Sequence, residues 1–175
     1  MANILNLFKF IESKRKQYHV PLRYKLINNL PLSKDELTVD GDLNLDRTSI
    51  QSLPNNLTVN GGLNLSYTPI QSLPNNLTIN GYLDLSNTQI KSLPNNLKVG
   101  GGLYLAKSKI KSLPDNLKVG GHLNLRNTPI QSLPNNLTVN GILDLERTPI
   151  SEKYTKEQVI KMIASTGGSV KGIYI

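Results

Sequence analysis

The side chains that most often perform catalysis are few in this sequence and widely spaced. The chain has no cysteine and only two histidines, His19 and His122. A histidine-based metal site needs several such ligands at close spacing, and none can be written here. Asp84 and Asp144 recur at one place in a repeated pattern, but roughly 14 Å apart at strand spacing, too far for a pair of catalytic carboxylates. We therefore predict no enzymatic activity and no cofactor.

Two weaker signals also favour structure over chemistry. Asp40, Asp42 and Asp46 cluster at the start of the repeats and suggest calcium as one reading. Solvated turn carboxylates are the favoured reading, because calcium takes six or more oxygen ligands. The paired glycines do not follow the G-x-G-x-x-G spacing of a phosphate-binding loop, so they are expected to lie in turns.

Basic residues form the second group with chemical meaning. The formal charge is +8, and residues 1–30 hold six lysines and arginines against one glutamate. A second group lies in residues 91–118, where six lysines accompany a single acid: Lys91, Lys98, Lys107, Lys109, Lys111 and Lys118. Two pairs of these lysines recur one repeat apart, about 5 Å if adjacent strands carry them, and like charges so placed destabilise a sheet by up to about 1 kcal/mol.

This charge pattern has two interpretations. A repeat that accepts the repulsion indicates a binder of nucleic acid or another polyanion, with the basic N-terminus contributing. Alternatively, the long lysine side chains simply extend into water. No aromatic residue alternates with Lys91, Lys98, Lys111 or Lys118, which argues against a groove that stacks single-stranded bases.

The middle of the chain is a repeat with a period of 20 residues, which predicts a solenoid whose units stack on their neighbours. Six glycine-led segments begin at Gly41, Gly61, Gly81, Gly101, Gly121 and Gly141. Leu63 and Leu65 alternate with smaller or polar residues, as in a strand with one buried face. Asn60-Gly61 predicts a tight turn with positive φ between "LTV" and "LNL". A column of threonines, with Ser108 as its exception, should bond backbone groups of the adjoining turn.

The pattern L-x-L-x-x-T-x-I-x-x-L-P-x-x-L resembles a leucine-rich repeat, with threonine where that family usually has asparagine or cysteine. Its short period and "LP" step are similar to the bacterial subclass of secreted effectors and to short repeat proteins of tailed bacteriophages and their hosts. The resemblance covers residues 31–150 and implies parallel strands, in either a curved horseshoe or a straighter β-solenoid. No segment is long enough for the ubiquitin-ligase domain that effector relatives often carry.

The flanks are expected to be caps. The predicted organisation is a helical basic cap over 1–30, six repeats over 31–150, and a helix followed by a short strand over 151–175. Thr155 and Gln158 form a capping box, and the apolar stripe behind it is Val159, Ile160, Met162 and Ile163. No stretch approaches the roughly 20 apolar residues of a membrane-spanning helix, and we expect a cytoplasmic protein of a bacterial or phage-infected cell.

The outward positions that vary between repeats carry the functional hypothesis. Tyrosines stand on three consecutive repeats, and tyrosine is enriched in interface centres. The predicted partner-binding residues are Tyr67, Tyr82, Tyr104, Asn64, Asp84, His122, Asn124 and Arg126. We predict a scaffold that binds another protein. The resemblance implies that this partner is a host or defence protein. A structural part of a virion is the other alternative, and the final strand "GIYI" could join two copies through its edge.

Overall fold

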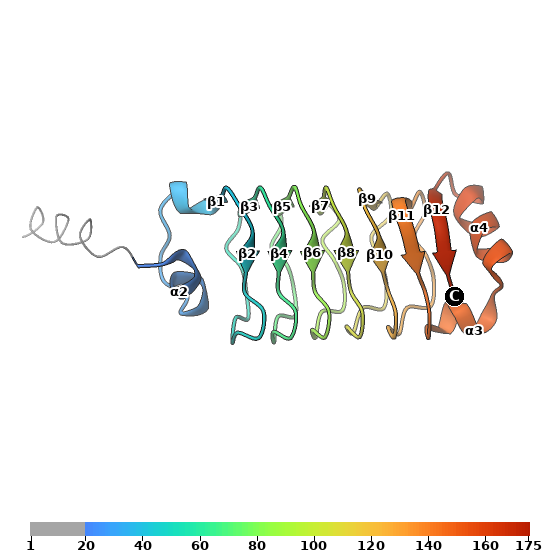
Figure 1. Ribbon diagram of the computed structural model, residues 1–175, viewed down its shortest axis with the longest axis horizontal. Coiled ribbons are helices and arrows are strands. Elements are labelled where there is room, and N and C mark those ends of the chain that lie inside the picture. The colour runs from blue at the N-terminus through green and yellow to red at the C-terminus, as the bar shows by residue number, and fades with distance from the viewer. Residues whose placement is uncertain (1–19) are drawn as a thin grey trace, which may run out of the picture.

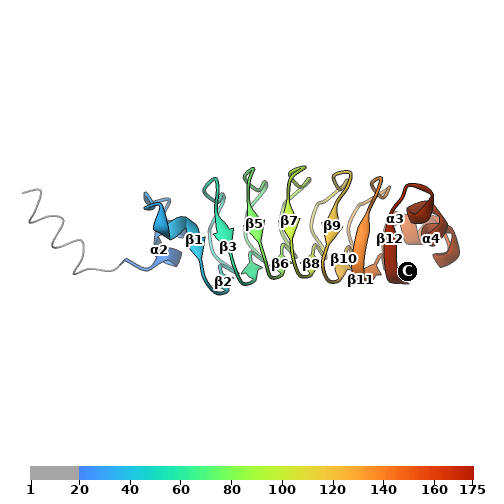
Figure 2. The ribbon, with the colours of Figure 1, turned by 90° about the horizontal axis from the view of Figure 1, so that it is seen from above.

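The computed structural model describes residues 20–175, which form a stack of 20-residue rungs along a nearly straight axis (Figures 1 and 2). Each rung contributes a short strand to each of two lines. The first line is β1 (Thr38–Val39), β3 (Thr58–Val59), β5 (Thr78–Ile79), β7 (Lys98–Val99) and β9 (Lys118–Val119). The second is β2 (Leu43–Asn44), β4 (Leu63–Asn64), β6 (Leu83–Asp84), β8 (Leu103–Tyr104) and β10 (Leu123–Asn124), and β11 (Thr138–Asp144) runs through both.

Neighbouring strands are parallel and shifted by one whole repeat. Leu63 lies opposite Leu83, and Thr58 lies opposite Thr78. The same offset joins the other rungs, so equivalent residues stack above one another. This register confirms the predicted solenoid of parallel strands. The nearly straight course of the axis in both views favours the straighter β-solenoid over the horseshoe.

The core is a column of leucine, isoleucine and valine inside the coil. Leu63, Leu65 and Ile70 are fully buried, and Val59 closes the opposite side. Other rungs supply the same positions, and the buried side chains form one continuous cluster. Burial of apolar area stabilises by about 25 cal/mol per Å², but here each rung needs its neighbours to exclude water. The buried strand face predicted for Leu63 and Leu65 is confirmed.

The threonine column lies inside the fold and closes the turn after each second-line strand. The Oγ1 of Thr88 donates to the carbonyl of Leu85 at 2.6 Å, and Thr68 and Thr128 make the same bond. The accepting carbonyl belongs to the threonine's own turn, three residues earlier, so the predicted bond to the adjoining turn was wrong. Ser108 is the exception: its Oγ is the one buried side-chain oxygen without a partner in residues 20–175.

The predicted tight turn at Asn60-Gly61 was also wrong. Neither residue has a positive φ, and the last rung crosses this point as one uninterrupted strand, β11. Glycine is required here by close stacking instead. A Cβ on Gly81 would lie 2.6 Å from the carbonyl carbon of Gly61, whereas a Cβ on Gly41, in the first rung, would meet nothing within 4 Å.

Caps cover both ends of the described stack. Before the first rung lie α2 (Leu22–Ile27), which buries Leu26, and a single 3₁₀ turn (Asp35–Leu37). After the last rung come α3 (Pro149–Lys153), α4 (Lys156–Ser165) and β12 (Ser169–Tyr174). The part of the predicted N-terminal cap before Val20, with His19 and most of its basic residues, lies outside the described residues.

The C-terminal cap agrees with its prediction in most details. Thr155 and Gln158 form the capping box of α4, and β12 pairs in parallel with β11. Val159 and Ile163 are buried, but Ile160 of the predicted stripe is exposed because it falls on the outer side of α4. The helix α3, which Thr148 caps, was not predicted. Within residues 20–175, no helix combines the length and apolar character needed to cross a membrane.

The glycine column gives a matched test of rung stacking. We expect Gly81→Ala to lower the free energy of unfolding by about 1–3 kcal/mol, because its methyl group meets backbone that cannot move aside. Gly41→Ala should leave stability nearly unchanged. Urea unfolding followed by circular dichroism measures both, and equal effects of the two substitutions would contradict close stacking.

The unpartnered hydroxyl of Ser108 gives a second test. Ser108→Ala removes no hydrogen bond, so the free energy of unfolding should stay within about 0.5 kcal/mol of its original value. Thr88→Val keeps the shape of its side chain but leaves the Leu85 carbonyl without its hydroxyl donor, and should destabilise by about 1–3 kcal/mol. Urea unfolding of both variants provides the comparison, and a larger loss for Ser108→Ala would be inconsistent with the structure.

Candidate functional site

Two tyrosines form a pair on the outer surface of the second line of strands. The rings of Tyr82 and Tyr104 meet edge to face, with centroids 6.4 Å apart and an interplanar angle of 65°. Asp84 lies opposite Tyr104 in the ladder, so Tyr82 and Tyr104 are diagonal neighbours on adjoining rungs, which is within reach of aromatic side chains. Such a pair contributes about 0.5–1.5 kcal/mol beyond its buried area. We call this surface, centred on Tyr82 and Tyr104, the tyrosine face.

Glycines make room for both rings. A Cβ on Gly62 would lie 2.1 Å from the Tyr82 ring, and a Cβ on Gly102 would lie 2.8 Å from the Tyr104 hydroxyl. The rings therefore occupy space that side chains fill elsewhere, and they lie along the sheet instead of projecting into solvent. Both residues are half-buried. Their orientation is fixed before any partner arrives.

The Tyr82 hydroxyl is held in its neutral form. Burial of the side chain raises the pKa of Tyr82 above its ordinary value, and the carboxylates of Asp42 and Asp84 raise it further. A neutral phenol can both donate and accept a hydrogen bond. The tyrosine face thus presents an apolar ring surface with a hydroxyl donor.

Tyr67 belongs to a different contact. It follows β4, is half exposed, and the guanidinium carbon of Arg47 lies 4.4 Å from its ring centroid. A cation in this position is attracted to the ring by about 0.5–1 kcal/mol at an exposed site. The structure therefore brings together two of the three predicted tyrosines, and it places the third in a cation–π pair with a basic residue.

Tyr67 also occupies a column of left-handed backbone that was not predicted. The residues of this column have φ between 53° and 58°: Arg47, Tyr67, Asn87, Lys107, Asn127 and Arg147. Asparagine tolerates this conformation, but tyrosine, lysine and arginine are strained in it, by an amount of order 1 kcal/mol. Asparagine at two of the six positions, Asn87 and Asn127, was the feature of the sequence that indicated this backbone conformation. The four strained side chains all point away from the core.

The predicted binding residues Asn64, Asp84 and Asn124 have a role within their own rungs. Each Oδ1 accepts a hydrogen bond from the backbone N–H two residues later, at 2.8–3.0 Å. These bonds form Asx turns that shape the end of each strand. Tyr104 takes this place in the fourth rung, so that turn lacks the bond and an aromatic ring stands there instead.

His122 and Arg126 complete the predicted set. His122 is exposed, and its Nδ1 accepts a hydrogen bond from the backbone N–H of Ile142 at 2.9 Å. Arg126 forms an ion pair with Glu146 on the next rung. An exposed pair of this kind contributes at most about 1 kcal/mol. Both residues therefore contact the rung that follows them.

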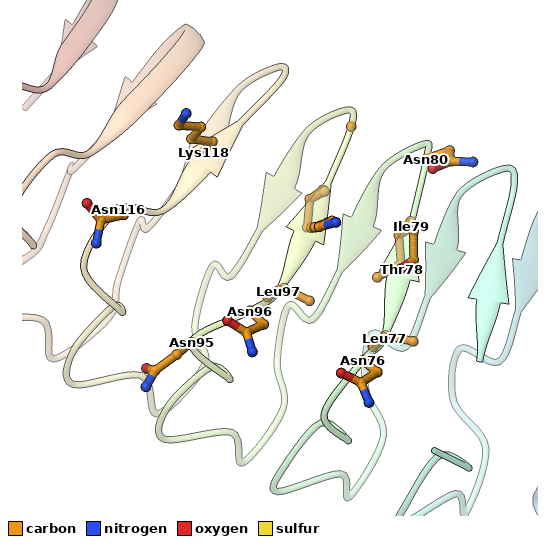
Figure 3. A pocket seen from close by; sticks show the side chains of 13 residues that line it. Asn76, Leu77, Thr78, Ile79, Asn80, Asn95, Asn96, Leu97, Asn116 and Lys118 are labelled. Atoms are coloured by element: carbon orange, nitrogen blue, oxygen red, sulfur yellow. The ribbon is translucent and has the colours of Figure 1, made fainter. Parts of the chain in front are cut away.

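The six predicted anion-binding lysines do not share one surface. Lys98 and Lys118 lie on adjoining first-line strands, β7 and β9, where they line a groove (Figure 3). Lys107 lies in the left-handed column after β8. Lys91, Lys109 and Lys111 lie in the segments that return from the second line to the first. All six are exposed.

Two of the three aspartates at the start of the repeats accept hydrogen bonds from the second rung. Asp42 Oδ1 accepts from the backbone N–H of Gly62 at 2.6 Å, and Asp40 Oδ1 accepts from the Asn60 amide. Within the part of the chain that the structure describes, no group of three or more histidines, cysteines or acids could hold a metal ion.

No protein-family model matches the sequence, and no curated protein matches it significantly.

The raised pKa of Tyr82 predicts a pH effect on stability. The Tyr82 hydroxyl keeps its proton to higher pH in the folded state than in the unfolded chain, where its pKa is about 10. The free energy of unfolding is therefore unaffected by this group below pH 10 and falls as the pH rises above that value. We expect Tyr82→Phe to unfold less readily than wild type in this alkaline range and to match its pH dependence below it. Urea unfolding across pH measures the difference. Identical alkaline profiles would contradict the predicted shift.

Proposed function

We propose that this protein is a non-enzymatic binding module that docks another protein on the tyrosine face. The observation that carries the proposal is the fixed pair of Tyr82 and Tyr104, set edge to face over Gly62 and Gly102. Tyrosines supply large contact area at a low cost in conformational entropy. Because these rings are already held in place, little further ordering is needed on binding.

The surroundings of the pair support the same function. The left-handed column beside the second-line strands keeps strained side chains, including Tyr67 and Arg47, at outward positions. Strain in an exposed column contributes nothing to the core, and such strain is concentrated at functional sites. Tyrosine and arginine are also the residues most enriched among strong interface contacts.

The resemblance to short leucine-rich repeats suggests the setting. On this proposal the chain is a repeat protein of bacterial or bacteriophage type, working in the cytoplasm, and its partner is a host or defence protein. The step from fold to partner is an analogy, since one fold serves many functions.

The central test removes the tyrosine pair. We expect Tyr82→Ala with Tyr104→Ala to weaken partner binding by about 30-fold or more, as for a pair of hot-spot residues. The matched control is Tyr24→Ala with Tyr174→Ala, which removes two tyrosines that are both 56% exposed and lie in the caps. Isotope-labelled pull-downs from host cells identify partners lost only with the first pair, and calorimetry with the purified partner gives the affinities.

The circular dichroism melting curve decides whether the first variant is folded. If that folded variant retains every partner in the same amounts as wild type and the control, the tyrosine face is not the docking surface.

A further inference from the structure

A groove with a volume of about 730 Å³ crosses β5, β7 and β9 on the first line of strands (Figure 3). Asparagine side chains from three successive rungs lie along it, including Asn76, Asn96 and Asn116, and Lys98 and Lys118 contribute its only charged side chains. We call it the lysine groove. It is separate from the tyrosine face, since it belongs to the other line of strands.

Three departures from the repeat coincide at this groove. The position before the first-line valine or isoleucine holds threonine in β3, β5 and β11 but lysine at Lys98 and Lys118. Two positions later, asparagine gives way to Gly100 and Gly120. The preceding turn changes as well, because Asn96 lacks the positive φ that Asn76 and its equivalents in three other rungs share.

The glycines expose the rung backbone beside the lysines. A Cβ on Gly100 would lie 2.2 Å from the carbonyl oxygen of Asn80, and a Cβ on Gly120 would lie 1.8 Å from that of Gly100. The backbone here therefore follows a course that only glycine permits. Glycine in place of asparagine also ends a ladder of side-chain hydrogen bonds, in which the Asn80 amide donates to Asn60 Oδ1 on the preceding rung. The two rungs that carry the lysines therefore have no asparagine side chain at this position, and Gly100 lines the groove.

The charge of the groove is uncompensated within the described residues. Lys98 and Lys118 stand one rung apart on paired strands, which places their Cβ atoms about 5 Å from each other. Among residues 20–175, the ion pairs within 4.0 Å involve Lys25, Arg47 and Arg126, not these lysines. The acid nearest to Lys118 in sequence, Asp115, accepts two hydrogen bonds from Asn135 on the following rung.

We propose that the lysine groove binds an acidic, extended segment of a protein. The carboxylates of that segment would pair with Lys98 and Lys118 and relieve their mutual repulsion. Asn76 Nδ2 already donates to Asn56 Oδ1, and Asn116 Oδ1 already accepts from Asn136 Nδ2. The Asn76 oxygen, the Asn116 amino group and the Asn96 amide would therefore bond its main chain, because an amide side chain offers both donors and acceptors.

The composition of the groove favours a polypeptide over a nucleic acid. No aromatic side chain lines it, so bases have no surface on which to stack. It contains no arginine, the side chain that recognises phosphate with two parallel hydrogen bonds. Two cations also fall short of the roughly 6–10 phosphate contacts of a typical DNA-binding protein.

The test uses a fluorescein-labelled decaglutamate peptide and fluorescence anisotropy at low ionic strength. We expect Lys98→Glu with Lys118→Glu to weaken binding at least about tenfold, the effect of losing a complementary charge pair. The matched control is Lys91→Glu with Lys111→Glu, which makes the same change in net charge at two exposed lysines that also stack one rung apart. This control should remain within about twofold of wild type, since only the general field changes.

A second variant separates loss of peptide binding from misfolding. Lys98→Thr with Lys118→Thr installs the residue of the other rungs, so it should melt like wild type and still lose peptide binding. Equal weakening by the groove and control variants would overturn the proposal, as would failure of wild type to bind the peptide. Binding of a thymidine oligonucleotide through these lysines, without peptide binding, would also overturn it. None of these outcomes depends on the tyrosine face.

Discussion

In-register stacking of one rung on the next is the constraint on which the whole structure depends. No rung has enough apolar surface to fold alone, and each buries its leucines only when Leu63 lies opposite Leu83 and the same offset continues along the chain. A slip of one residue would turn every leucine toward solvent. The fixed offset of 20 residues follows from this requirement, and it places equivalent side chains above one another on every face.

Stacking also couples surface positions that look independent in the sequence. Asp42 accepts the N–H of Gly62, and His122 accepts that of Ile142, each one rung later. Tyr82 can lie flat only because the equivalent residue of the preceding rung is Gly62. A substitution at the surface therefore acts on the residue 20 positions away as well as on solvent. The residue types allowed at one position of a rung are therefore limited by the equivalent positions of the adjoining rungs, even on a surface where no partner binds.

The period of the repeat made the parallel strands and the buried columns predictable, because both depend on apolar spacing. The C-terminal capping box was predictable from a short local motif, Thr155 with Gln158. Asn60-Gly61 was misleading because the pair is common in hairpins, whereas here glycine is required by the close approach of the preceding rung, where a Cβ on Gly61 would lie 2.6 Å from the carbonyl carbon of Gly41. The left-handed column was hidden by Arg47 and Tyr67, which rarely adopt that conformation. The tyrosine pair and the lysine groove depend on side-chain directions, which spacing alone does not fix.

The two candidate surfaces differ in the physics by which they would hold a partner. The tyrosine face offers rings already packed against glycine and against each other, so its contribution is short-range and nearly independent of salt. The lysine groove offers two unpaired cations within the described chain, and its attraction reaches about 10 Å at moderate salt before screening removes it. A partner that used both would be drawn in by charge and retained by aromatic contact. Because Gly101 and its neighbours connect β7 directly to β8, the same rung would then carry both functions.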